Sequence, residues 1–344
     1  MVDTSKIIGF HKRIVFSKTP LKGCLRYKNK FQIFPANLKD MPKSKRQKHF
    51  PIVLELFLDE KDIVEHNEPF FETLEELGMR TASISTKEDE ILMLLTLFSN
   101  HLFFKYDGLK GSWGLPLFDD DSNEEIDSRS SSWNMEMFHW PILPDELIID
   151  GFTDIQLNQV NLIEHKKYFS FDPNLDFDSK KEISFPETIF QGLSSYYSKN
   201  VTSIGHLQSA ISHIRESIEF FHNKKTMSLI AAFTAIETMV NMEYKDFKPT
   251  VCDCCDQLVF KVSERYREFL FKYIGKSQKN KSKFNKFYSL RSKIIHAGMK
   301  LKSENLWSNL PENEKSNEFI SRIEIIQLAK FSIFNWLLLN PNTK

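Results

Sequence analysis

The segment FYSLRSKIIHAG, residues 287–298, places an arginine and a histidine where they could act on one phosphate group. Arg291 and His296 are separated by four residues, near the predicted end of a helix. An earlier apolar segment, FTAIETMV, contains Glu237, and a carboxylate in such surroundings needs a partner. Metal-free RNA cleavage requires a cation, a base and an orienting carboxylate, because the 2′-OH must lose a proton and the phosphorane charge must be met. These three residues are the predicted catalytic residues.

A run of lysines without an acidic residue precedes this motif and begins at Lys276. Lysine contacts to phosphate are independent of base sequence and sensitive to salt, so the run could hold an RNA backbone. A solvated, flexible loop explains the run equally well. Tyr288 could stack on a base or pack against the protein. The predicted RNA-binding residues are Lys279, Lys281, Lys283, Lys286, Tyr288 and Lys293.

Residues from about 203 to 340 resemble a HEPN domain, and more closely its ApeA-like branch. The resemblance rests on AAFTAIETMVN, CCDQLVFKVSERYREFLFKYIG, LRSKIIHAG and an apolar closing helix. It implies a dimerising bundle of helices and a metal-independent endoribonuclease that serves as a toxin or in defence against phage. It assigns Arg291 to the scissile phosphate, His296 to proton transfer and Glu237 to the acidic position of its helix. Gly298 departs from the pattern, since many HEPN nucleases have an aromatic residue two positions after the histidine.

The spacing of Arg291 and His296 raises a geometric question, because a five-residue separation puts them about 140° apart on an ideal helix. A distorted helix end, an arginine side chain that reaches around the helix, or a site shared by two subunits would each bring them together. The shared site agrees with the dimers of the family, and we expect it here. A second pair, Arg215 and His222, is predicted to lie on one helical face but lacks the Ala-Gly ending, and is interpreted as a solvated edge.

Three of the four cysteines lie close together in the sequence and contain one C-x2-C pair. A structural zinc uses four Cys or His ligands, so the three would need a histidine such as His222, or the same loop of a second subunit. The fourth, Cys24, is predicted to belong to another domain. We expect reduced thiols and no cofactor, with a structural zinc as the alternative. The three clustered residues are Cys252, Cys254 and Cys255.

Two predicted parts must position these groups, and together they predict an α+β fold. Residues 1–200 are expected to form a mixed, strand-rich sensing or regulatory domain with at least one buried helix. That helix is expected at ILMLLTLFSN, capped by Ser85 or Thr86. The acidic stretch DDDSNEEIDSRSSS is predicted to be a solvated loop. The strand-like segments are KRIVFS, KGCLRYKNKFQIF, FPIVLELFLD, HLFFKYDG, WNMEMFHWPIL and ELIIDGFTDIQL.

Residues 203–341 are predicted to form an all-α bundle of the HEPN type, without strands. Apolar residues spaced by three and four predict a helix over 205–222. The segment 225–244 is apolar over most of its circumference, which is typical of a central helix. Further helices are expected at 263–274, 283–297 and 317–339, ended by Gly275, Gly298 and Asn340-Pro341.

The charge of the chain is balanced overall and unevenly distributed. The 344 residues contain 46 Lys+Arg and 46 Asp+Glu. From residue 203 onward there are 22 basic and 14 acidic residues, a net charge of +8, which leaves −8 for the first 202 residues. The basic part could attract a polyanion such as RNA. The longest apolar stretches are shorter than the ~20 residues that span a bilayer, and the N-terminal residues contain no secretory h-region, so a cytoplasmic protein without membrane contact is expected.

Three functions fit these features. The first is a HEPN endoribonuclease, a dimeric toxin or anti-phage effector that leaves a 2′,3′-cyclic phosphate and a 5′-hydroxyl. The second is a non-catalytic dimerisation or RNA-binding module whose N-terminal domain senses a phage or regulatory partner. Gly298 and the 140° offset favour the second. A zinc-dependent nucleic-acid adaptor is a third.

Overall fold

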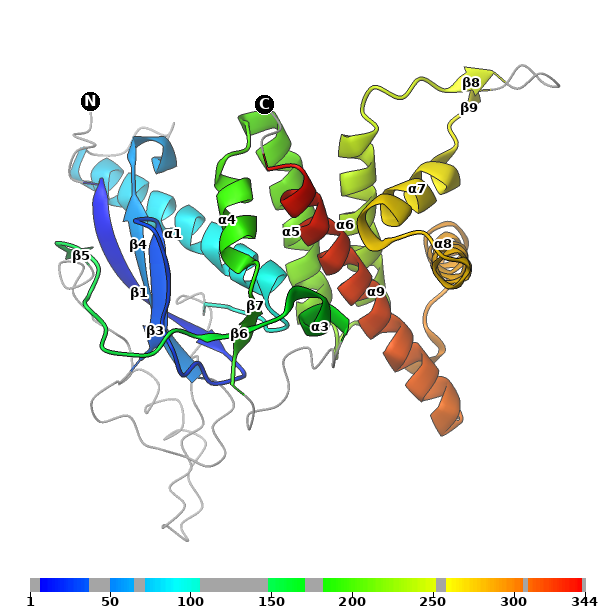
Figure 1. Ribbon diagram of the computed structural model, residues 1–344, viewed down its shortest axis with the longest axis horizontal. Helices are drawn as coiled ribbons and strands as arrows, with labels where there is room; N and C mark the ends of the chain where they lie inside the picture. Colours follow the sequence, from blue (N-terminus) through cyan, green and yellow to red (C-terminus); the bar gives the residue numbers. More distant parts are fainter. Residues whose placement is uncertain are drawn as a thin grey trace, which may run out of the picture. The chain divides into compact units, whose positions relative to one another are not determined.

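The computed structural model describes residues 7–36, 50–64, 72–105, 148–170, 182–251, 258–305 and 309–341. These residues form two compact units. The second unit contains the chain from Glu187 onward and two earlier segments, Thr96–Phe98 and Glu164–Leu175, and the first unit contains the rest. The protein is α+β, as predicted: the first unit contains an antiparallel sheet, and the second is built mainly from helices (Figure 1).

The first unit contains a five-stranded sheet made of β1 Gly9–Ser17, β2 Leu25–Tyr27, β3 Phe31–Pro35, β4 Phe50–Leu58 and β5 Ile148–Ile149. The strand order is β2-β3-β4-β1-β5, and all neighbouring strands are antiparallel. β1 and β4 pair along their whole length. Val15, Ile33 and Leu54 are completely buried, because β-branched and other apolar side chains pack well on one side of a pleated sheet.

The remaining elements before Glu187 are short, except for one long helix. This helix, α1, spans Glu72–Phe98. A 3-10 turn, Glu60–Asp62, follows β4, and α3 covers His165–Ser170. β6 Asn161–Ile163 and β7 Ser184–Pro186 form a separate parallel pair.

The first three strand-like segments of the sequence form β1 to β4. The five other predictions for this part are wrong, are met only in part or lie outside the described residues. Ser85 and Thr86 do not cap a helix, because α1 starts thirteen residues before Ser85; the Ser85 hydroxyl instead accepts a hydrogen bond from Lys105 Nζ at 2.7 Å. In the described residues, HLFFKYDG contributes only a bridge between Phe16 and Phe104, and ELIIDGFTDIQL contributes only β5. WNMEMFHWPIL and the acidic stretch lie outside the described residues.

The second unit is built around one central helix. Its helices are α3, α4 Ile189–Tyr197, α5 Val201–Glu219, α6 Lys225–Glu243, α7 Val262–Ile274, α8 Gln278–Ala297 and α9 Glu312–Leu339, with a 3-10 turn at Lys302–Glu304. α6 contacts α5, α7, α8 and α9, and Ala232, Phe233 and Ile236 on it are completely buried (Figure 1). The predicted central helix is therefore confirmed. Among the described residues, no helix combines the length and apolar character needed to cross a membrane.

The C-terminal ends of α7 and α8 lie where the glycines predict them, whereas the start of α8 differs from its prediction. Gly275 and Gly298 follow α7 and α8 with φ of 118° and 63°, values that suit a residue without a side chain. α8 begins at Gln278, five residues earlier than predicted, because the Ser277 side chain accepts a hydrogen bond from the Asn280 backbone N–H at 3.1 Å. Lys279 and Lys281, which precede the predicted start of this helix, therefore lie on α8 and not in a flexible loop.

The predicted absence of strands in this part is also wrong. Two strands of two residues each, β8 Thr250–Val251 and β9 Leu258–Val259, form an antiparallel pair. This pair lies between α6 and α7. Strands of two residues are too short to show the alternation of apolar and polar residues by which a strand is predicted from sequence.

Glu243 ties the C-terminal end of α6 to two neighbouring helices. Its carboxylate accepts hydrogen bonds from Tyr273 Oη on α7 at 3.0 Å and from Trp336 Nε1 on α9 at 2.9 Å, and it forms an ion pair with Lys272. Burial acts to raise the pKa of Glu243, but the hydrogen bonds from these three partners outweigh it and hold the pKa below its ordinary value.

Gly192 lets α4 approach two aromatic rings of the same unit. A Cβ at this position would lie 2.5 Å from a ring carbon of Phe334 and 2.8 Å from one of Phe98. The two rings are themselves packed edge to face, with centroids 4.6 Å apart. The glycine is thus required by the close contact between α4 and this aromatic pair.

We expect Gly192→Ala to lower the free energy of unfolding by ~1–3 kcal/mol, because the added methyl group overlaps both rings. Gly205→Ala on α5 is the control: nothing lies within 4 Å of a Cβ there, so the better helix propensity of alanine should stabilise the protein slightly. Urea unfolding followed by circular dichroism measures both changes. Equal stability of the two variants would contradict this packing.

We also expect Glu243→Gln to lower stability at neutral pH by an amount that shrinks in acid. A carboxylate with a lowered folded-state pKa stabilises the protein above its unfolded pKa of ~4.3, and this contribution disappears as the pH falls through the folded-state value. Urea unfolding of the parent and the variant between pH 7 and pH 3 measures the difference. A difference that does not change with pH would show that the ionised carboxylate contributes nothing.

Candidate active site

Helices α6 and α8 bring together the three predicted catalytic residues. Arg291 is four residues after Phe287 and three before Ile294, and because both are buried, Arg291 starts on the packed side of α8. Glu237 lies on α6, directly after the completely buried Ile236. Residues 54 positions apart in the sequence are thus neighbours because α6 and α8 pack against each other.

Arg291 and Glu237 form a two-point ion pair between these helices. Arg291 Nη2 donates to Glu237 Oε2 at 2.9 Å, and Arg291 Nε lies 2.6 Å from Oε1. The exposed fractions of the two side chains are 15% and 22%, so solvent screens the pair less than a surface pair. The second of these contacts lacks the geometry of a hydrogen bond, so one hydrogen bond and one close ion-pair contact hold the guanidinium against the carboxylate.

The remaining nitrogen of the same guanidinium, Nη1, faces His296. Arg291 Nη1 lies 2.9 Å from His296 Nε2, and the imidazole is exposed. A guanidinium can only donate hydrogen bonds, so Nε2 must accept. The contact is a hydrogen bond only when Nε2 carries no proton, that is, in the neutral ring with its proton on Nδ1.

This contact corrects the expectation that two subunits are needed to bring the arginine and the histidine together. α8 continues regularly to Ala297, so the helix end is not distorted, and the contact forms within one chain. The flexible arginine side chain crosses the 140° offset by reaching around the helix. The prediction was wrong because Cα positions alone do not include the reach of a long side chain.

Tyr266 on α7 is a further residue of this site that the sequence analysis did not identify. Its exposed fraction is 1%, and its hydroxyl has no hydrogen-bond partner in the described part of the chain. Burial raises the pKa of Tyr266 well above its ordinary value, and the nearby carboxylate of Glu237 adds to this effect. The spacing of Tyr266, Phe269 and Tyr273 could have predicted a buried face of α7, but not its position beside the ion pair.

The predicted RNA-binding residues are distributed over several sides of α8. Tyr288 packs against Tyr266, with ring centroids 5.4 Å apart. Lys283 is held by Glu324 of α9, to which it donates at 2.7 Å. The remaining lysines are exposed, including Lys276 just before the helix: Lys279, Lys281, Lys286 and Lys293.

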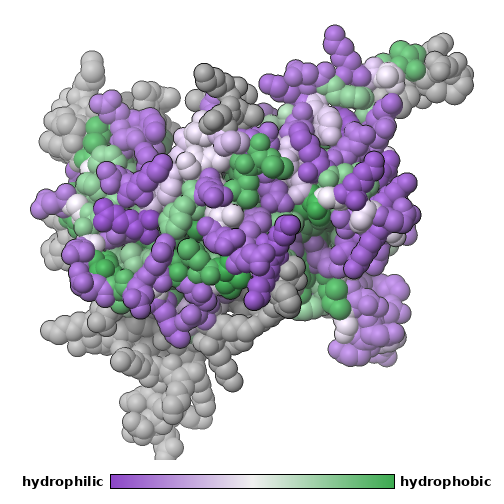
Figure 2. Space-filling view, viewed as in Figure 1, coloured by the Kyte–Doolittle hydropathy of each residue, from purple (hydrophilic) through white to green (hydrophobic). Residues whose placement is uncertain are grey.

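Three of these exposed lysines share one line along α8. Lys279, Lys286 and Lys293 recur every seven residues, which places them on nearly the same side of a helix. Lys293 is also three residues before His296, so the two are neighbours on the helix surface. In Figure 2, mainly hydrophilic residues cover the end of α8 that faces the viewer. A row of cations therefore leads along α8 to the histidine.

The remaining candidate residues have different outcomes. Cys252, Cys254 and Cys255 lie outside the described residues. α5 ends at Glu219, so Arg215 and His222 do not share a regular helix as predicted. In the described part of the chain, no three or more His, Cys, Asp and Glu side chains are grouped so that they could hold a metal ion.

We expect strong coupling between Arg291 and Glu237 in a double-mutant cycle. Arg291→Ala and Glu237→Ala should each lower the free energy of unfolding by ~1–3 kcal/mol, because each leaves a largely buried charge without its partner. The double variant should lose less than the sum of the two, with a coupling energy of ~0.5–3 kcal/mol.

The matched control is the exposed pair Lys315–Glu312, whose coupling should be below ~1 kcal/mol. Urea unfolding of all variants measures both cycles. Strictly additive effects at Arg291 and Glu237 would show that the two side chains do not form this ion pair in solution.

Comparisons with known proteins found no relative of this chain. No protein-family model matches the chain, and neither a curated protein nor a solved structure matches it. The groups that meet at the site are a guanidinium, an imidazole and a carboxylate.

Proposed function

We propose that the protein is a HEPN-type endoribonuclease that cleaves RNA without a metal ion through Arg291 and His296. The observation that supports this most directly is the position of one guanidinium, which contacts Glu237 on one side and His296 on the other. Glu237 orients the cation, and the cation lies beside a neutral base. The row of exposed lysines on α8 supports a polyanionic substrate.

Binding of a phosphodiester is the step that frees the imidazole. Arg291 Nη1 occupies the lone pair of His296 Nε2 in the free protein. An anionic phosphate oxygen accepts a guanidinium N–H more strongly than a neutral imidazole does, so the substrate takes over Nη1 while Glu237 keeps Nη2. His296 Nε2 can then accept the proton of the 2′-OH.

The proposed reaction is a transesterification within the RNA strand. The 2′-oxygen forms a bond to phosphorus, the bond from phosphorus to the 5′-oxygen breaks, and Arg291 meets the charge of the phosphorane. The products are a 2′,3′-cyclic phosphate and a 5′-hydroxyl. The leaving 5′-oxygen needs a proton from the side opposite the attacking oxygen, and a second copy of the chain, bound through the helical unit, would supply it from its own His296 in the imidazolium form. That ring becomes neutral while the imidazole that accepts the 2′-OH proton becomes an imidazolium, so the protons balance. We therefore include a homodimer in the proposal.

The biological part of the proposal is a toxin or anti-phage effector that acts in the cytoplasm. An RNA-cleaving activity that stops translation would suit either role. The first 202 residues carry a net charge of −8 and would repel RNA, which favours a partner-sensing or regulatory role for them over substrate binding.

A non-catalytic RNA-binding or dimerisation module is the second candidate. Two observations favour it: Gly298 supplies no side chain to position a ligand, and Arg291 occupies the basic nitrogen of His296 in the free protein. Such a module would bind RNA through the lysines of α8 and leave it intact.

The test is cleavage of total RNA by the purified protein in the presence of EDTA, with sequencing of the new termini. We expect cyclic phosphate ends, and a ~10²–10⁴-fold slower rate for His296→Ala, because a general base contributes about this factor. Arg291→Lys should also be slow, since lysine keeps the charge but cannot contact Glu237 and the phosphate in the same planar arrangement.

His213→Ala is the control, because His213 is a partly exposed histidine on α5 that pairs with Glu216. It should cleave as fast as the parent. Intact RNA with the parent protein, or equal rates for His296→Ala and the parent, would exclude the nuclease and favour the binding module.

A further inference from the structure

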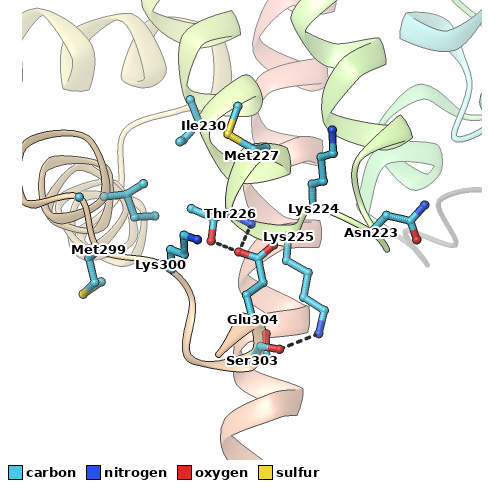
Figure 3. Close-up of a pocket in the computed structure, with 12 residues that line it drawn as sticks. Asn223, Lys224, Lys225, Thr226, Met227, Ile230, Met299, Lys300, Ser303 and Glu304 are labelled. Carbon is cyan, nitrogen blue, oxygen red and sulfur yellow. Dashed lines mark hydrogen bonds between the residues drawn. The ribbon is translucent and has the colours of Figure 1, made fainter. Parts of the chain in front are cut away.

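A groove of 680 Å³ lies where the start of α6 meets the end of α8 (Figure 3). This volume is within the range of sites that hold a small molecule or one unit of a polymer. The walls include Ile230 of α6 and Ile294 of α8. Met227 and Met299 add apolar surface that is 47% and 41% exposed. The groove therefore offers an accessible apolar surface suited to a flat, apolar group.

Three lysines surround this apolar surface. Lys225 Nζ donates to the Ser303 carbonyl oxygen at 3.3 Å, and Lys224 lies over the ring of Phe220, with Nζ 5.2 Å from the centroid. Lys300 is exposed and has no hydrogen bond or ion pair with any described residue. At least one cation is thus available to an anionic ligand without breaking an existing ion pair.

The one carboxylate in the groove is already engaged. Glu304 Oε2 accepts a hydrogen bond from the Thr226 backbone N–H at 3.0 Å and another from the Thr226 hydroxyl, as the dashed lines in Figure 3 show. Glu304 therefore occupies the N-terminal end of α6 and caps it. An incoming anion would be bound by the lysines and not by the helix end.

We propose that this groove binds one nucleotide of single-stranded RNA, with its base on Met227, Ile230 and Met299 and its phosphate on Lys224 and Lys300. A nucleotide combines a planar, largely apolar base with an anionic phosphate, which matches an apolar surface bordered by ammonium groups. Methionine thioethers contact aromatic rings favourably. The identification of the strand as the substrate rests on the proposed function.

The position of the groove relative to Arg291 supports this assignment. Ile230 and Glu237 are seven residues apart on α6, so they lie on the same side of the helix, about 10 Å apart along its axis. On α8, Ile294 and Gly298 lie two residues before and after His296. A strand with its scissile phosphate at Arg291 would reach the groove with an adjacent nucleotide.

Gly298 has a place in this arrangement. It has a φ of 63°, and no atom lies within 4 Å of a Cβ built there, so the wall of the groove is open at this residue. An aromatic side chain at this position would project from the wall of the groove. The groove thus offers a way to hold the base that needs no side chain at position 298.

The test measures binding of a short fluorescein-labelled 2′-O-methyl RNA, which cannot be cleaved because its 2′-oxygen is blocked. In the full chain, Lys224→Glu/Lys300→Glu should weaken binding roughly tenfold and lower the slope of log K against log[salt] by ~0.7 for each lost phosphate contact. Met227→Ser/Met299→Ser should weaken binding several-fold with an unchanged slope, because base contacts release no counterions.

The matched control is Lys245→Glu/Lys248→Glu, which makes the same change of charge beyond the opposite end of α6. It should bind as the parent does. Groove variants that bind no more weakly than this control would overturn the proposal, and so would a loss of affinity in the lysine variant alone, since the base would then lie elsewhere. A mononucleotide that binds the parent when the strand does not would also overturn it.

These outcomes are separate from those of the proposed nuclease. Failure of the parent to cleave RNA removes the nuclease activity and leaves the binding result of the groove variants interpretable. Cleavage by the parent together with unchanged binding by the groove variants removes the groove alone.

Discussion

The contact between Arg291 and Glu237 determines the geometry of the whole candidate site. The carboxylate accepts a hydrogen bond from Arg291 Nη2 at 2.9 Å and lies 2.6 Å from Nε, which leaves Nη1 facing His296. The same contact joins α8 to the central helix α6. Loss of either charge would therefore change both the packing of α8 and the environment of the imidazole.

α6 is bound to neighbouring segments by polar contacts at three places along its length. Near its start, Thr226 is bound by Glu304 of the turn after α8; in its middle, Glu237 holds Arg291; at its end, Glu243 holds α7 and α9. The groove lies beside the first attachment and the arginine–histidine contact lies beside the second. The central position of α6 explains why residues from distant parts of the sequence meet along it.

α8 has a packed side and an exposed, basic side. Phe287, Arg291 and Ile294 lie on the side that packs on the protein, whereas Lys279, Lys286 and Lys293 form the exposed row. A helix of twenty residues is ~30 Å long, enough to present several nucleotides with cations while its packed side stays fixed. In the proposed function, one rigid helix thus binds the strand and positions the reactive groups.

The sequence alone determined the α+β class, the central helix, the glycine ends of α7 and α8, and the three residues that meet at the site, because helical spacing and glycine stops depend on neighbours close in the chain. Helix starts were harder to predict. Ser85 precedes an apolar run and looks like a cap, but it lies inside α1. Ser277 does cap α8, although no apolar run follows it. Only the tertiary structure decided that Arg291 reaches His296 within one chain, that Tyr266 lies beside the ion pair, and that the groove opens between α6 and α8. These depend on side-chain reach and on packing between distant segments, and local spacing contains neither.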